Sequence, residues 1–203
     1  MKEQTYFKAI EKIYKKNKGF VTREEIDDQG IPSWFLSDFV KRKSLIKVAP
    51  GFYADVEFVI DEYYILQRRF PKYIISGMSA LFIHHLTDKI VTNIEVTAPQ
   101  GYNPTRSRVD KLIVHKISDK EKYLLGIEEK LSMFGNKIRV YDPERTICDI
   151  IKYRDNYDSE TFVKAIKLYL KRYNNIFKLI KYSKTLGIEK KVFEIMELMT
   201  NVD

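Results

Sequence analysis

The sequence predicts an α+β protein, in which an N-terminal winged helix-turn-helix is followed by a mixed α/β domain with a helical C-terminal end. Three observations predict this class. Within residues 1–54, three segments with helical apolar spacing precede two short strand-like runs. Short helices and β-branched runs then alternate along the middle of the chain, and from about residue 143 the pattern is helical. We therefore expect two domains, residues 1–54 and 55–203.

Composition excludes several classes of protein. Hydrophobic residues make up 44% of the 203, too many for a disordered chain. The single cysteine excludes a disulfide framework and a cysteine-rich zinc module. No apolar run approaches the roughly 18 residues of a membrane span. Because the N-terminus also lacks the apolar core of a signal peptide, we expect a cytoplasmic protein with no membrane partner.

The basic excess lies at the two ends of the chain. The net charge is +8. Residues 1–54 hold 11 basic and 7 acidic residues, residues 152–203 hold the same numbers, and residues 55–151 hold 14 of each. Charge concentrated in defined segments favours an anionic partner such as nucleic acid, although a merely soluble basic protein is the alternative.

The first two helices are predicted by apolar spacing and by a capping pattern. Thr22 and Glu25 form a capping box, in which each side chain bonds the other's backbone amide. This box opens a short second helix that ends near Gln29, and Gly30 supplies the tight turn that follows. The first helix, residues 5–16, carries apolar side chains three and four positions apart: Phe7, Ile10, Ile13 and Tyr14.

The third helix has the character of a DNA-recognition helix. Pro32 and Ser33 open it, with Ser33 as the expected N-cap, and it runs to about Lys43. Leu36, Phe39 and Val40 form its inward face. The outer face is short and polar at its start and basic at its end, which suits base edges and phosphates respectively. Its residues are Ser33, Trp34, Ser37, Asp38, Lys41 and Arg42.

A tight β-hairpin completes the expected winged helix. Residues 45–49 and 52–54 are strand-like, and Pro50-Gly51 forms the turn between them. Such a short wing can reach only the adjacent backbone or minor groove. We expect DNA recognition by Ser33, Trp34, Ser37 and Lys41, with Arg23, Arg42 and Lys47 on the backbone. The alternatives are a generic small domain or a winged helix that binds protein, and Trp34 can equally pack on the domain.

The second domain is expected to mix short strands and helices. Helices are expected over residues 61–69 and 79–86, and Asp142 caps a later helix with Pro143 at its first position. The expected strands are residues 93–97, 111–117, 124–130 and 137–141.

Four stretches of the sequence form a combined pattern. They are the hairpin Leu45-Ile46-Lys47-Val48-Ala49-Pro50-Gly51-Phe52-Tyr53-Ala54, residues 73–87 with Ser76-Gly77-Met78-Ser79-Ala80-Leu81, the strand Ile94-Glu95-Val96-Thr97-Ala98-Pro99, and residues 140–149 with Asp142-Pro143-Glu144-Arg145-Thr146. In order and spacing, across about residues 20–150, they resemble the AbiEi antitoxin family of type IV toxin–antitoxin and abortive-infection systems.

The resemblance implies a two-part protein with no cofactor and no catalytic residue. Its winged helix-turn-helix would bind double-stranded DNA at inverted repeats in its own promoter and repress the operon. Its C-terminal domain would act as an antitoxin, in phage defence, against a nucleotidyltransferase-like toxin, and a stable complex between the two would not be required.

A second basic surface is predicted near the C-terminus. From Val163 to Thr185 there are seven basic residues and no acidic one, on a helical pattern that breaks at Asn174-Asn175. This face is either simply solvated or binds an anion, such as flanking DNA or the toxin's nucleic-acid substrate. Its expected residues are Lys164, Lys167, Lys171, Lys178 and Lys181.

Two other functions stay open on the sequence. Glu128-Glu129-Lys130 contains the E-x-K pattern of many nucleases, with Asp110 or Glu95 as a partner carboxylate for magnesium. A ligand-sensing regulator is the other alternative. We expect no metal at the adjacent His84 and His85, which point in different directions on a helix. Arg145 and Asp149 are expected to form a helix ion pair, and Cys148 to be buried.

Overall fold

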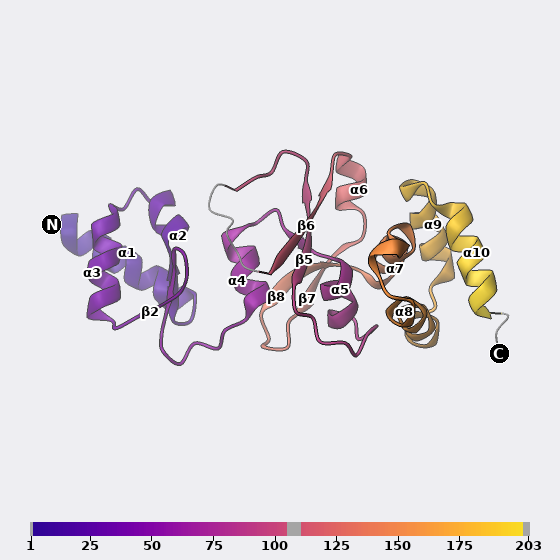
Figure 1. Ribbon diagram of the computed structural model, residues 1–203. Helices are drawn as coiled ribbons and strands as arrows, with labels where there is room; N and C mark the ends of the chain where they lie inside the picture. The colour runs from indigo at the N-terminus through magenta and orange to yellow at the C-terminus, as the bar shows by residue number, and fades with distance from the viewer. Residues whose placement is uncertain (1, 105–110, 201–203) are drawn as a thin grey trace. The chain divides into compact units, whose positions relative to one another are not determined.

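The computed structural model describes residues 2–104 and 111–200 (Figure 1). The chain forms two compact units, residues 1–65 and 66–203, each with its own core. Residues 55–65, which we assigned to the second domain, group with the first unit. Helix α4 (Glu62–Arg69) spans the division.

In the first unit, the helices and strands follow one another in the order α–β–α–α–β–β. The three strands form an antiparallel sheet with the order β1-β3-β2, and the register between β2 and β3 shifts at Val48. This irregularity twists the hairpin locally. The elements are α1 (Lys2–Lys16), β1 (Phe20–Thr22), α2 (Arg23–Asp28), α3 (Ser33–Arg42), β2 (Ile46–Ala49) and β3 (Phe52–Ala54).

Local signals in the sequence explain most of these boundaries. The capping box is confirmed, because the Thr22 side chain accepts from the Glu25 amide and the Glu25 side chain accepts from the Thr22 amide. Gly30 has φ +64°, as the expected turn requires. The predicted cap at Ser33 is wrong: helix α3 begins at Ser33, and its N-cap is Pro32, which has no side-chain hydrogen bond.

Residues 55–65, which follow the hairpin, bond to and pack against the rest of the first unit. The Asp55 carboxylate accepts hydrogen bonds from the Tyr14 hydroxyl at 2.6 and 2.7 Å, and the Asp55 amide donates to the Gly19 carbonyl at 2.9 Å. The hydrogen bond with Asp55 and burial raise the pKa of Tyr14 to about 12. Phe58 and Ile65 pack on Phe20 and Phe52. The segment after the hairpin therefore belongs to this unit's core.

The second unit has a mixed sheet in its described residues, with the order β6-β5-β4-β8-β7. Strand β4 runs parallel to β8 and antiparallel to β5, while β5 and β6 are parallel and β7 and β8 antiparallel. One helix was not predicted: Asp119 caps α6 (Lys120–Leu124), so strand β7 begins at Ile127. The remaining bounds are β4 (Ile74–Ile75), α5 (Gly77–Ile83), β5 (Ile94–Pro99), β6 (Leu112–Ile117), β7 (Ile127–Leu131) and β8 (Lys137–Tyr141).

Helices gather at the C-terminal end of the second unit (Figure 1). Helix α7 lies at their centre and contacts α5, α8, α9 and α10. Asp142 accepts from the Arg145 amide and caps α7, as predicted, with Pro143 at the first position. The elements are α7 (Pro143–Lys152), the 3₁₀ turn η1 (Arg154–Asn156), α8 (Ser159–Arg172), α9 (Ile176–Leu186) and α10 (Glu189–Thr200).

Candidate nucleic-acid interface

Helix α3 has one buried face and one exposed face. Phe35, Leu36 and Phe39 are buried in the core of the first unit, against α1 and α2. This apolar anchoring fixes which side of the helix meets solvent. The residues predicted for DNA recognition on this helix are all exposed: Ser33, Trp34, Ser37, Lys41 and Arg42.

The small polar groups lie near the start of α3. Because Ser33 does not cap the helix, its hydroxyl is not committed to the first turn. The Ser37 hydroxyl donates to the Ser33 carbonyl at 3.4 Å, a long bond that a better acceptor can replace. Trp34 is 53% exposed, and its indole stacks on Phe35 with ring centroids 3.6 Å apart. It therefore combines a packed face with an accessible one.

The basic side chains of the interface differ in how far neighbouring carboxylates neutralise them. Arg42 Nη2 lies 2.8 Å from Asp38 Oδ2, and its guanidinium covers the Phe7 ring at 4.5 Å. Arg23 Nε lies 2.7 Å from Asp27 Oδ1. In the described part of the chain, Lys41 and Lys47 have no ion pair and are exposed. Of the four basic residues predicted to contact DNA, Lys41 and Lys47 are therefore the two that no carboxylate of the described residues neutralises.

The hairpin is joined directly to the start of α2. The Arg23 amide donates to the Gly51 carbonyl at 2.7 Å, and a Cβ at Gly51 would lie 3.2 Å from Arg23 Cβ. Gly51 has φ +74°, so the turn favours glycine for its conformation as well as its size. This contact places the backbone of Arg23 beside the hairpin tip. Sequence spacing gave no sign of it.

The predicted second basic surface divides into paired and unpaired lysines. Lys164 pairs with Asp88, and Lys178 Nζ lies 3.0 Å from Asp142 Oδ2 and 2.8 Å from Glu144 Oε2. Burial acts to lower the pKa of Lys178, but hydrogen bonds with the two carboxylates outweigh burial and raise it. Among the described residues, Lys167, Lys171 and Lys181 carry no ion pair and are exposed.

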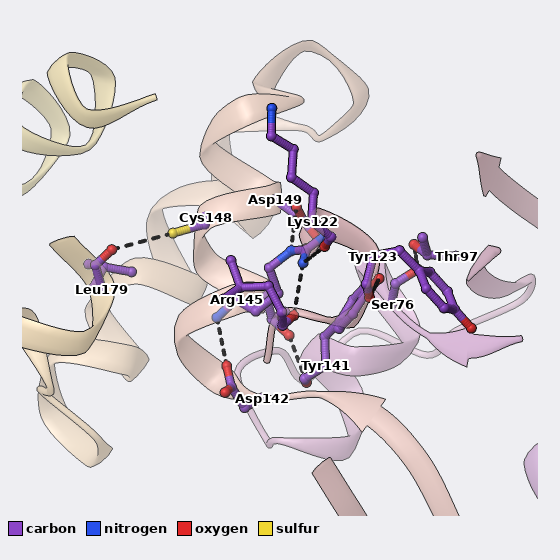
Figure 2. Close-up of polar contacts among 12 residues, drawn as sticks. Ser76, Thr97, Lys122, Tyr123, Tyr141, Asp142, Arg145, Cys148, Asp149 and Leu179 are labelled. Atoms are coloured by element: carbon purple, nitrogen blue, oxygen red, sulfur yellow. Dashed lines mark hydrogen bonds and ion pairs between the residues drawn. The ribbon is translucent and has the colours of Figure 1, made fainter. Parts of the chain in front are cut away.

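Arg145 and Asp149 of α7 form a buried ion pair within the second unit (Figure 2). Arg145 is buried, its Nε lies 3.1 Å from both Asp149 carboxylate oxygens, and its guanidinium covers the Tyr141 ring at 4.1 Å. The predicted helix pair is thus confirmed. Cys148 is buried, as expected, with its Sγ 3.7 Å from the Leu179 carbonyl. Burial raises the pKa of Cys148, so its thiol stays protonated.

The E-x-K residues contact a buried histidine. His84 Nε2 lies 2.7 Å from the Tyr141 carbonyl, and Nδ1 lies 3.1 Å from Lys130 Nζ. A carbonyl only accepts and an ammonium only donates, so Nε2 carries the proton. Burial lowers the pKa of His84 to about 4. Glu128 Oε1 lies 3.9 Å from His84 Nε2, at the edge of ion-pair range.

Of the other two carboxylates considered for a nuclease, Glu95 is described by the structure and belongs to no group of side chains that could hold a metal ion. Glu95 Oε2 lies 3.2 Å from His115 Nε2, and Asp110 lies outside the described residues. Within residues 2–104 and 111–200, no group of three histidine, cysteine or acidic residues could hold a metal ion. In the same residues, no helix is long and apolar enough to cross a membrane.

Comparisons with known proteins bear on the first unit and on the fold. No curated protein matches this chain. The crystal structure of the RV2827C protein from Mycobacterium tuberculosis is similar, with a TM-score of 0.59 and 13% identity, over 89% of this chain and 71% of that one. At this identity the similarity shows a shared fold alone. A family model described as the transcriptional regulator AbiEi antitoxin matches residues 9–54, which confirms the resemblance to AbiEi regulators over this segment.

Proposed function

We propose that residues 1–54 act as a winged helix-turn-helix that binds double-stranded DNA. Helices α2 and α3 with the turn at Gly30 form the helix-turn-helix, and the hairpin β2–β3 forms the wing. The observation that carries this proposal is the division of α3 into a buried apolar face and an exposed face of hydroxyl and basic groups. The match to a family of transcriptional regulators over residues 9–54 supports it independently.

In the proposed complex, α3 lies in the major groove. Ser33, Trp34 and Ser37 would face base edges, and Lys41 at the other end of the exposed face would contact phosphate. The wing would lie along the backbone. Its Lys47 and the nearby Arg23 would contact phosphates, as would Arg42 after exchange of its Asp38 partner.

The wider proposal is an antitoxin that represses its own operon. The first unit would bind inverted repeats in the protein's own promoter, and the second domain would counteract a nucleotidyltransferase-like toxin in the cytoplasm during phage defence. A stable complex would not be required. The match to an AbiEi regulator family supports an antitoxin-type regulator. Lys167, Lys171 and Lys181 are the proposed second anion-binding surface, for flanking DNA or for the toxin's nucleic-acid substrate.

A salt-titrated mobility shift tests the DNA proposal. The full chain is titrated onto DNA from upstream of its own gene and onto a scrambled duplex. The double variant Lys41→Ala/Lys47→Ala should weaken binding to both and reduce the slope of log K against log salt by about 2, one unit for each phosphate that a lysine no longer neutralises. Lys190→Ala, an exposed lysine of α10, is the control for loss of charge. Equal binding of wild type to both duplexes would overturn operator recognition.

Growth assays test the antitoxin proposal separately. The full chain is co-expressed with the nucleotidyltransferase encoded beside its gene, under a promoter that this protein cannot repress. We expect growth to be restored, and expect the Lys41→Ala/Lys47→Ala variant to restore it equally well. Failure of wild type to restore growth would contradict the antitoxin role while leaving the DNA-binding result intact.

A further inference from the structure

Helix α9 leaves one aromatic side chain almost fully in solvent. Phe177 is 84% exposed, more than any other aromatic side chain that the structure describes. The helix is anchored by its opposite face, where Leu179, Ser183 and Leu186 are buried, and by Ile176, which packs against the core of the second unit. Because these residues hold α9 in place, the exposed ring contributes little to the fold.

Unneutralised positive charge lies beside this ring. Lys181 follows Phe177 by one helical turn, on the same exposed face of α9. A short connection joins the first turn of α9 to the last turn of α8, which carries Lys171 and Arg172. Within the described residues, Lys171 and Lys181 have no ion pair, and Arg172 donates to a neutral acceptor, the His85 carbonyl. These three cations therefore keep their charge for an external anion.

The segment itself supplies no competing carboxylate. From Val163 to Thr185 the sequence contains seven basic residues and no acidic one. Acidic groups from elsewhere in the chain reach other lysines of the segment: Asp142 and Glu144 hold Lys178, for example. A polyanion that meets the end of α8 and the start of α9 would thus be attracted by a charge of one sign.

The ring and the cations together indicate which kind of polyanion fits. In a duplex the faces of the bases are stacked on one another, so they cannot stack on an aromatic side chain. A single strand offers both contacts, because its unstacked bases can lie on aromatic rings while its phosphates pair with lysine and arginine. Phe177 therefore favours a single strand over a duplex, which would use the cations alone.

We propose that the end of α8 and the start of α9 bind single-stranded nucleic acid. One base would stack on the Phe177 ring, and the flanking phosphates would contact Lys171 and Lys181. This site specifies the ligand of the second anion-binding surface and rests on that proposal, whereas DNA binding by the first unit does not enter it.

Fluorescence anisotropy with two labelled oligonucleotides tests this site. One is oligothymidylate of about twelve nucleotides, and the other is an abasic strand of the same length, which has the phosphates but no bases. The full chain carries Lys41→Ala/Lys47→Ala, so that the phosphate contacts proposed for the first unit are removed. We expect oligothymidylate to bind about five- to hundredfold more tightly than the abasic strand, as for one stacked base.

Variants separate the ring from the charge. Phe177→Leu should remove most of the preference for oligothymidylate and leave binding of the abasic strand unchanged, while Phe177→Trp, which keeps a ring, should retain the preference. Phe193→Leu, on α10, replaces a ring that is 49% exposed and is the matched control. Lys181→Ala should weaken binding of both strands and reduce the slope of log K against log salt by about 0.7.

The outcomes distinguish this site from the surface on which it rests. Equal affinity for the two strands, or an equal loss for both in Phe177→Leu, would overturn base stacking and leave a surface that binds anions through its lysines alone. If neither strand binds, the anion-binding surface fails and the single-strand site fails with it, which would leave the exposed ring to a protein partner.

Discussion

Two arginine–aspartate pairs on helices α3 and α7 share the same chemistry and the same four-residue spacing. On α3, Arg42 and Asp38 side chains are 66% and 36% exposed, and on α7 those of Arg145 and Asp149 are 0% and 13% exposed. The first pair is solvated and can exchange its partner for a phosphate. The second is enclosed by Tyr141 and backbone carbonyls and cannot. Charge on a helix is therefore available for recognition only where burial leaves it free.

The largest effect is expected at the buried pair. Arg145→Ala would leave the Asp149 carboxylate buried without its partner, which should lower the free energy of unfolding by about 3–5 kcal/mol. Urea unfolding followed by circular dichroism measures it. If Arg145→Ala lowered the free energy of unfolding by less than about 1 kcal/mol, the buried pair would contribute no more to stability than the exposed Arg42–Asp38 pair does.

A pH effect of similar origin is expected at His84. Its pKa falls from 6.5 to about 4 on folding, so the unfolded chain binds the additional proton between these values. Stability is therefore complete above pH 6.5 and decreases as the pH falls toward 4, by about 3 kcal/mol in total.

Urea unfolding at a series of pH values measures this effect. His84→Gln, although less stable, should lose most of the pH dependence in this window. An unchanged pH dependence in that variant would assign the titration to other groups.

A smaller effect is expected for DNA binding at the solvated end of α3. Lys41→Ala should weaken affinity about fivefold and reduce the salt slope by about 1, as for one phosphate contact. Lys178→Ala, whose ammonium is held by Asp142 and Glu144, should leave DNA affinity unchanged. If Lys178→Ala weakens DNA binding as much as Lys41→Ala does, then an ion pair with a carboxylate does not decide whether a lysine can contact DNA.

The smallest effect is expected for stability at the exposed pair. Arg42→Ala should change the free energy of unfolding by no more than about 1 kcal/mol, because exposed ion pairs contribute little. The same variant should still weaken DNA binding in the mobility shift. If Arg42→Ala lowered the free energy of unfolding by several kcal/mol and left DNA affinity unchanged, Arg42 would stabilise the fold and would not contact DNA.

Signals close together in sequence predicted their structures well. The Thr22–Glu25 box, the turn at Gly30, and the Asp142 cap were all confirmed, because each depends on residues within one helical turn. The exposed face of α3 also follows from apolar spacing. The roles of its residues stay predictions.

Contacts between distant residues could not be predicted in this way. Lys178 was predicted on a second basic surface, and its pairing with Asp142 and Glu144 could not be foreseen because both lie more than thirty positions away in the chain. Arg23 likewise meets Gly51 only when the hairpin folds back. Even a local signal failed at Ser33, where the preceding proline took the cap position.

The hydrogen bonds of Asp55 with Tyr14 and Gly19 determine where a fragment that contains the first unit can end. A fragment ending at Ala54 would keep every predicted DNA contact but lose the carboxylate that holds Tyr14, together with Phe58 and Ile65 of the core. A fragment ending after Ile65 would retain them. A module built from this unit, made to carry the predicted DNA contacts on another protein, would therefore need about eleven residues past the hairpin, by the division of the chain at Ile65.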